Sequence, residues 1–297
     1  MTDTRRTHLL ATLALVGITA AWGSTFFMTK DLLERLPLLD YLAVRFTIAG
    51  LFLALLAPRS LRSLSGSSAK HAVLLGAMYG VAQVLQTAGL ILTPASVAGF
   101  ITGMYVVLTP VLGALLLRHR VGVWTWFAVA LAMTGLAVLT LDGLSVGYGE
   151  ALVLVSTVLY AGHIVGLGVW SKPDMAIGMS IVQLLVIAVI AWVVAVPDGI
   201  QLPGSAADWA RLLYMSIVAG ALAMLGQTWA QAHLPAVRTA IIMAMEPVFA
   251  AFFAVLFGGE NATVRMLAGG LLVLAAMVLV ETLPRRRVEA EVTHLSV

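Results

Sequence analysis

Tyr79, Gln83 and Gln86 follow Gly76 at helical spacing within a stretch that is otherwise apolar. Intervals of three, four and three residues place these side chains on one face of a helix. Amides and phenols donate and accept hydrogen bonds, so this face is suited to contact a polar ligand. The alternative is that the face joins packed membrane helices, where each polar contact contributes about 1 kcal/mol. The pattern favours a cavity wall, with Tyr79 and Gln83 as its main candidates.

A second apolar stretch carries the same pattern, with Gly220, Met224, Gln227 and Gln231 on one helix face. Because the pattern recurs, both helices are expected to face a common interior. Gln227 is therefore a further candidate for the cavity wall.

Aromatic and histidine side chains extend this set. Tyr160 and His163 lie one helical turn apart, and Trp22 and Tyr105 lie near glycines. An aromatic ring can stack on an amphipathic substrate, and His163 can respond to protons. The alternatives are that His163 is a neutral, hydrogen-bonded packing group and that the aromatic residues are ordinary interior side chains.

Glu246 is the only acid near the middle of an apolar stretch, and it directly precedes Pro247. Ionisable residues at membrane depth usually face the bundle interior or a water-filled cavity. Glu246 is therefore a candidate for proton exchange, together with His163. Alternatively, Glu246 is neutral, or it pairs with Arg45 or Arg238 without titrating.

The elements that position these side chains are predicted to lie in a membrane. Apolar residues make up 61% of the 297 residues, charged residues make up 10%, and the mean hydropathy is +1.02, whereas soluble chains carry more charge. Ten stretches of about 20 apolar residues could each cross the hydrocarbon core. They lie at about 9–29, 39–57, 71–92, 95–117, 122–140, 149–170, 175–196, 209–232, 236–257 and 263–283. Lipid offers the backbone no hydrogen-bond partner, so the expected fold is all-α and polytopic, with ten transmembrane helices.

The chain is duplicated. Gln86-Thr87 and Gln227-Thr228 are each followed seven residues later by Pro-Ala, and the two copies are 141 positions apart. We expect two five-helix repeats, at about 9–140 and 149–283. Since five crossings are an odd number, the second repeat must insert upside down, as in many transporters.

Pro110 and Pro247 lie within the fourth and ninth stretches, where proline interrupts helix hydrogen bonding. They are predicted hinges, although an insertion or deletion of a few residues disturbs their register. The spacings Gly99-x-x-x-Gly103 and Gly162-x-x-x-Gly166 predict close helix packing.

Lys and Arg predominate in the connections that share a side with the two ends of the chain. Basic connections stay in the cytoplasm, so both termini and the tail at 284–297 are expected there. The net charge of +3 reflects this asymmetry and not a nucleic-acid surface. A cleavable signal peptide is the alternative for the first stretch, but its length and the ten-span parity favour retention. The short connections predict a single membrane domain over 1–297.

Four motifs occur in an order that resembles EamA-type members of the drug/metabolite transporter superfamily. They are Ala21-Trp22-Gly23-Ser24-Thr25-Phe26, Arg45-Phe46, Met245-Glu246-Pro247-Val248-Phe249 and Gly259-Glu260. The resemblance extends over all ten stretches. It implies a carrier of the bacterial inner (plasma) membrane with two inverted halves, usually exporting amino acids or related metabolites and sometimes drugs.

Binding, and not bond-making, is the chemistry expected of these residues. The absence of cysteine excludes thiolate chemistry, and there is no H-E-x-x-H motif or pair of membrane aspartates. We expect no enzyme activity, catalytic residue, metal or cofactor. The expected partners are the lipid bilayer and a small-molecule substrate.

The expected function is a secondary carrier that exports small neutral or zwitterionic metabolites, amino acids including aromatic ones foremost, by alternating access. Efflux of drugs or other metabolites is an alternative, and a channel-like pore is an alternative of another class. Spans one, three, four, six, eight and nine are expected to enclose the substrate cavity. Its predicted wall comprises Trp22, Tyr79, Gln83, Tyr105, Tyr160, His163 and Gln227.

Overall fold

The computed structural model describes residues 2–93, 95–117, 122–140, 147–196, 199–257 and 263–282, and every regular element in these ranges is helical. The first half contains α1 (Thr2–Leu33), α2 (Leu38–Leu56), α3 (Gly66–Leu92), α4 (Ala95–Gly103), α5 (Tyr105–Leu117) and α6 (Val123–Thr140). The second half contains α7 (Tyr148–Trp170), α8 (Ala176–Ala195), α9 (Ala206–Ser216), η4 (Ile217–Leu222), α10 (Ala223–Gln231), α11 (Ala236–Met243), α12 (Glu246–Phe257) and α13 (Val264–Thr282). Short 3₁₀ turns, η1 (Pro58–Ser63) and η2 (Pro173–Met175), follow α2 and α7.

The helices account for the ten expected spans. Seven segments of the described chain are long and apolar enough to cross a membrane, and shorter apolar helices occur at Ile101–Leu117, Val123–Gly135 and Leu267–Ala276. These three coincide with the expected fourth, fifth and tenth spans. Each half therefore carries five spans, which confirms the all-α polytopic fold of two oppositely directed repeats.

Three spans are not uniform α-helices. The fourth breaks at Met104, between α4 and α5, and the ninth breaks at Ala244 and Met245, between α11 and α12. In the eighth span, the π-helical turn η4 joins α9 to α10. Apolar composition alone predicted continuous helices, because hydropathy averaged over a window is insensitive to a lost backbone hydrogen bond.

The register of the repeat is preserved through the second part of each half. The starts of α4, α5 and α6 each precede the starts of α11, α12 and α13 by 141 positions. Pro110 is the sixth residue of α5, whereas Pro247 is the second residue of α12. The expected insertion or deletion is therefore wrong, since the helix breaks are equivalent and the two prolines are not.

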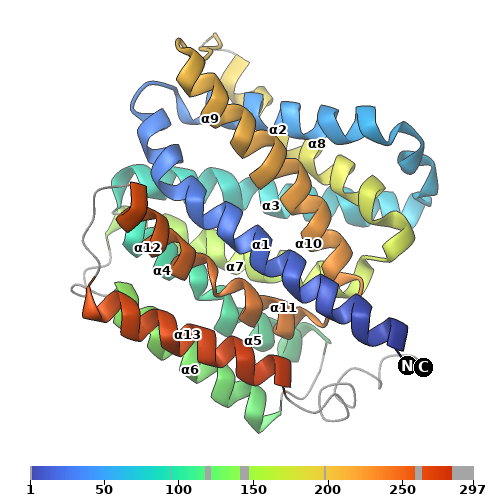
Figure 1. Ribbon diagram of the computed structural model, residues 1–297. Helices are drawn as coiled ribbons and strands as arrows, with labels where there is room; N and C mark the ends of the chain where they lie inside the picture. The colour runs from blue at the N-terminus through green and yellow to red at the C-terminus, as the bar shows by residue number, and fades with distance from the viewer. Residues whose placement is uncertain are drawn as a thin grey trace.

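Helix packing follows the same internal symmetry. Span eight (α9, η4 and α10) is the repeat copy of α3. The contact of α3 with α7 therefore corresponds to that of α10 with α1, and the contact of α3 with α8 corresponds to that of η4 with α2. α2 pairs with its own repeat copy α8, and α6 pairs with α13. In Figure 1, α6 and α13 lie together along the lower edge, α2 and α8 along the upper edge, and α1 between them.

Helices approach each other closely at several glycines, which coincide only in part with the glycines expected from the sequence. A Cβ atom on Gly23 would lie 2.7 Å from the backbone nitrogen of Ala250, so α1 directly contacts the backbone of α12. A Cβ atom on Gly99 would meet nothing within 4 Å, so no neighbouring helix approaches closely at Gly99 itself. At Gly162 the nearest atom is the terminal methyl of Met78, at 2.7 Å.

Candidate functional site

A cavity is lined by residues of both halves. The volume of this cavity is about 60 Å³. All the side chains predicted to form a substrate cavity lie on its wall, and Glu246 lies there too. These are Trp22, Tyr79, Gln83, Tyr105, Tyr160, His163 and Gln227. Their role in substrate binding stays a prediction.

Helices from both repeats supply this wall. α1 to α5 contribute from the first half, and α7, α10, α11 and α12 contribute from the second. The six spans expected to enclose the cavity all contribute, and span two adds Arg45. Pro110 and Pro247 are not among the lining residues, although their helices carry Tyr105 and Glu246.

A chain of hydrogen bonds links three helices along the wall. The amide nitrogen of Gln83 donates to the Tyr160 hydroxyl at 2.8 Å, and this hydroxyl donates to Gln86 Oε1 at 2.9 Å. Gln86 Nε2 then donates to the Thr102 hydroxyl at 2.9 Å. Such a chain fixes the orientation of each amide, because each group's role as donor or acceptor sets that of the next.

Gln227 has an unsatisfied acceptor. Its Nε2 donates to Gln231 Oε1 at 3.1 Å, and Gln231 Nε2 donates to the Ile164 carbonyl at 2.7 Å. Because Gln227 Nε2 is the donor in this chain of hydrogen bonds, the orientation of the Gln227 amide is fixed, and Oε1 is its other polar atom. Among the described residues Oε1 has no partner, although Gln227 is only 1% exposed. Buried polar atoms normally have partners, so this oxygen is suited to accept a hydrogen bond from a cavity occupant.

His163 is fully enclosed by protein. Its Nε2 lies 2.7 Å from Gln183 Oε1, and the Gln183 amide nitrogen donates to the Met179 carbonyl. Because Gln183 Oε1 can only accept, His163 Nε2 carries the proton in this arrangement. The ring centroid of His163 lies 5.0 Å from that of Tyr79. His163 thus has the hydrogen bond of a packing group and also lies on the cavity wall.

The π-helical turn orients two wall residues. Trp22 Nε1 donates to the Ala219 carbonyl within η4 at 2.8 Å, and Arg45 Nε donates to the Met215 carbonyl just before η4 at 3.2 Å. Carbonyl oxygens where helical winding changes can lose their regular partners and accept from side chains instead. Span eight thereby holds side chains from α1 and α2 in place.

The breaks in spans four and nine meet at Tyr105. Pro247 has no N–H, so it cannot donate to the carbonyl of Met243, four residues earlier. The Tyr105 hydroxyl donates to this carbonyl at 2.6 Å, and Glu246 Oε2 lies 3.4 Å from the same hydroxyl. Tyr105 and Glu246 are the first residues of α5 and α12, and they occupy equivalent positions in the two repeats.

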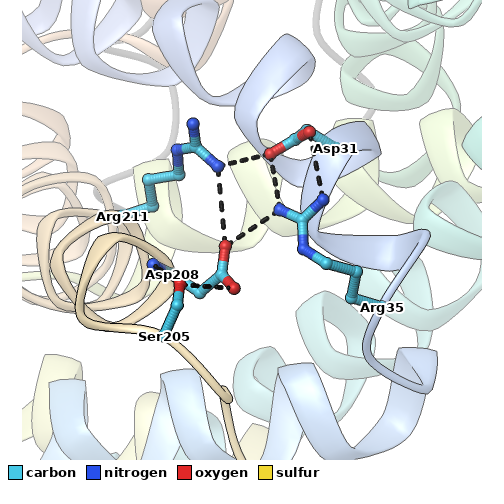
Figure 2. Close-up of polar contacts among 5 residues, drawn as sticks. All are labelled: Asp31, Arg35, Ser205, Asp208 and Arg211. Carbon is cyan, nitrogen blue, oxygen red and sulfur yellow. Dashed lines mark hydrogen bonds and ion pairs between the residues drawn. The ribbon is translucent and has the colours of Figure 1, made fainter.

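An ion-pair cluster joins span one to span eight at the end of α1 (Figure 2). Arg35 Nη2 lies 2.8 Å from Asp31 Oδ2 and 2.9 Å from Asp208 Oδ1, and Arg211 contacts both carboxylates. Ser205 donates to Asp208 Oδ2 at 2.8 Å and caps α9. The hydrogen bond to Asp31, and to a smaller extent the one to Asp208, raises the pKa of Arg35 above its ordinary value. The cluster ties the far end of α1 to α9.

Several wall residues were missed from the sequence. Thr25, Phe26 and Thr29 share a helix face with Trp22 at intervals of three, four and seven residues, a pattern that was available in the sequence. Gln183 is not a lining residue, but it holds His163 by a hydrogen bond; the sequence gave no signal for this pairing, because only the fold brings α8 to His163. In the described ranges, no group of His, Asp or Glu side chains is placed to hold a metal ion.

Some predicted features lie outside the described residues. They are the proline of the first Pro-Ala pair, Pro94, the motif Gly259-Glu260, and the tail at 284–297.

Comparison with known proteins agrees with the duplicated architecture. A relative from Archaeoglobus fulgidus, described as an uncharacterized transporter, is 28% identical over 274 residues, which cover 92% of this chain and 86% of its own. A solved crystal structure matches with a TM-score of 0.75 at 18% identity, over 94% of this chain and 98% of its own, and therefore shows a shared fold. The sequence model of the EamA-like transporter family matches twice, over residues 9–141 and 147–282. With one match in each five-span half, the chain belongs to the EamA-like transporter family.

Proposed function

We propose that this protein is a secondary carrier of small neutral or zwitterionic metabolites, amino acids including aromatic ones foremost, that works by alternating access. The observation that carries the proposal is the cavity wall, which combines side chains from both oppositely directed halves. In transporters built from inverted repeats, substrate sites lie at the interface of the repeats, and broken helices contribute to them. Spans four and nine are broken, and both reach this cavity.

The composition of the wall supports this substrate class. Aromatic rings from Trp22, Tyr79, Tyr105 and Tyr160 provide stacking surfaces, and the amides provide hydrogen bonds. Among the lining residues that the structure describes, Arg45 is the one arginine and there is no lysine. A phosphorylated substrate would require a cluster of cations, so this wall favours neutral or zwitterionic molecules.

Rocking of the two halves would expose the cavity to each side in turn. The contact between Tyr105 and the Met243 carbonyl links the two broken spans, and Pro110 and Pro247 would act as bending points. The ion-pair cluster would hold one end closed, since it ties α1 to α9. Opening at that end requires these ion pairs to separate.

Glu246 and His163 are the candidates for coupling transport to protons, because both are buried ionisable residues on the cavity wall. We expect export driven by the proton gradient across the bacterial inner membrane. Replacement of Glu246 by Gln should then abolish the effect of a pH gradient on uptake.

We further propose a single membrane domain with repeats at about 9–140 and 149–283 and both termini in the cytoplasm. The start of α1 and the end of α13 lie toward the same side in Figure 1, as an even number of spans requires. With this orientation, the ion-pair cluster at the other end of α1 faces outward.

The proposal can be tested in proteoliposomes preloaded with unlabelled amino acids. Uptake of labelled aromatic and aliphatic amino acids should accelerate relative to empty vesicles, because a carrier exchanges substrate faster than it returns empty. Uptake that neither saturates nor accelerates would indicate a pore. No uptake of any amino acid, combined with exchange of a drug or another metabolite, would refute the amino-acid assignment and retain a carrier.

A further inference from the structure

Two buried ionisable side chains on the cavity wall have no oppositely charged partner in the described part of the chain. Arg45 comes from α2 of the first half and Glu246 from α12 of the second half. Each is only 7% exposed. Burying a charge without a partner costs free energy, so the absence of an ion pair at each position requires an explanation.

Arg45 is oriented entirely by neutral groups. Its Nε donates to the Met215 carbonyl at 3.2 Å, and its Nη1 donates to the Tyr41 hydroxyl at 2.9 Å. The guanidinium carbon lies 5.1 Å from the ring centroid of Phe46 and 5.7 Å from that of Tyr41. Nη2 has no hydrogen-bond partner among the described residues. The guanidinium is thus held rigidly with donors left for an anion.

Glu246 is similarly incomplete. Its Oε2 lies 3.4 Å from the Tyr105 hydroxyl, but this hydroxyl makes its short bond, 2.6 Å, to the Met243 carbonyl. No donor within the described ranges reaches Oε1. The carboxylate therefore retains nearly all of its capacity to accept hydrogen bonds from a cation.

Arg45 and Glu246 do not neutralise each other. The ion pairs of the described chain lie in the cluster of Asp31, Arg35, Asp208 and Arg211, and none joins these two wall residues. Both residues line the same cavity, so a ligand carrying one carboxylate and one ammonium group offers each of them a partner of opposite charge. An amine or an amide would leave Arg45 unpaired, and a simple carboxylic acid would leave Glu246 unpaired.

We propose that Arg45 binds the carboxylate, and Glu246 the ammonium group, of a zwitterionic α-amino acid in this cavity. The proposal deepens the carrier function above and rests on it for its transport consequence. An arginine guanidinium can donate two parallel hydrogen bonds to a carboxylate. It cannot pair in this way with an ammonium group, which has no acceptor. The aromatic and amide side chains of Tyr79, Gln83 and Tyr160 would then surround the substrate side chain.

Binding to the purified full-length protein tests the proposal independently of transport. The probes are L-phenylalanine and L-leucine, each with its amide, which lacks the carboxylate, and its deaminated acid, which lacks the ammonium group. Affinities can be measured by isothermal titration or by ligand-induced thermal stabilisation. For the wild type, both analogues should bind on the order of 100-fold more weakly than the intact amino acid, because each leaves one buried charge unpaired.

Replacement of the two residues should separate their roles. Arg45→Gln should reduce discrimination against the amide to a few-fold, while discrimination against the deaminated acid persists. Glu246→Gln should give the opposite pattern. Arg238→Gln, which changes a buried arginine outside the cavity wall, should leave both ratios at their wild-type values. A merely structural role of either residue would instead weaken all probes equally.

The wild-type comparison alone can overturn the proposal, so it does not depend on the variants folding. Equal affinity for an amino acid and either analogue, or no binding of either intact amino acid, would refute it. Equal effects of both variants on every probe would also refute it. Selective binding without exchange in proteoliposomes would retain this assignment and refute the carrier function.

Discussion

The hydroxyl of Tyr105 replaces the donor that Pro247 cannot provide, and removal of this hydroxyl should therefore have a cost that depends on Pro247. In Tyr105→Phe, the Met243 carbonyl loses its 2.6 Å partner in a region where Tyr105 is 2% and Met243 is 3% exposed. Hydrogen bonds between membrane helices contribute about 0.6 kcal/mol on average and up to about 1.7 kcal/mol. A buried carbonyl left without a partner belongs at the upper end, so we expect a loss of about 1–2 kcal/mol.

Pro247→Ala restores an N–H four residues after Met243. This N–H can donate to the Met243 carbonyl as in a regular helix. In this background, Tyr105→Phe should cost only about 0–0.5 kcal/mol, because the carbonyl keeps a partner. The two substitutions should therefore be coupled by about 1 kcal/mol.

Unfolding of the purified protein by SDS in mixed micelles, followed by circular dichroism, can measure this double-mutant cycle. Tyr214→Phe is the matched control, because its hydroxyl pairs with the Ser24 hydroxyl at 2.8 Å and not with a carbonyl freed by proline. Its cost should be the same with Pro247 or Ala. If Tyr105→Phe costs the same in both backgrounds, the assigned role of its hydroxyl is wrong.

Three further outcomes are expected. Replacing Pro110 and Pro247 together with Ala should reduce the turnover rate more than the apparent substrate affinity in exchange assays, and unchanged turnover would refute the hinge assignment. Arg211→Gln removes two contacts of the ion-pair cluster, so it should speed thiol labelling of a cysteine introduced into the cavity of this cysteine-free chain; an unchanged labelling rate would exclude the cluster as a closure. Gly23→Ala should lower stability by about 1–3 kcal/mol, because its Cβ would overlap backbone atoms of α12, whereas Gly17→Ala, with no atom within 4 Å, should not.

The sequence by itself determined the fold class and the faces of the helices. Runs of apolar residues specify membrane spans because the bilayer accepts only segments whose backbone is internally hydrogen-bonded. The offset of 141 residues identified the duplication, and the odd number of spans per copy required inversion. Helical periodicity then predicted that Tyr79, Gln83 and Gln227 share an interior, since polar side chains avoid lipid on every helix. The structure brings these residues into one cavity.

Only the tertiary structure decided which partners satisfy the hydrogen-bonding groups around the cavity wall. The breaks in spans four and nine and the π-helical turn are backbone events that hydropathy does not record. Their freed carbonyls are satisfied by side chains far away in the sequence, as Tyr105 does for Met243 and Trp22 for Ala219. The sequence also left open whether Arg45 pairs with Glu246. The structure assigns Arg45 neutral partners on α2 and span eight, because the packing of helices from both halves, and not the order of residues along one helix, sets which charges meet.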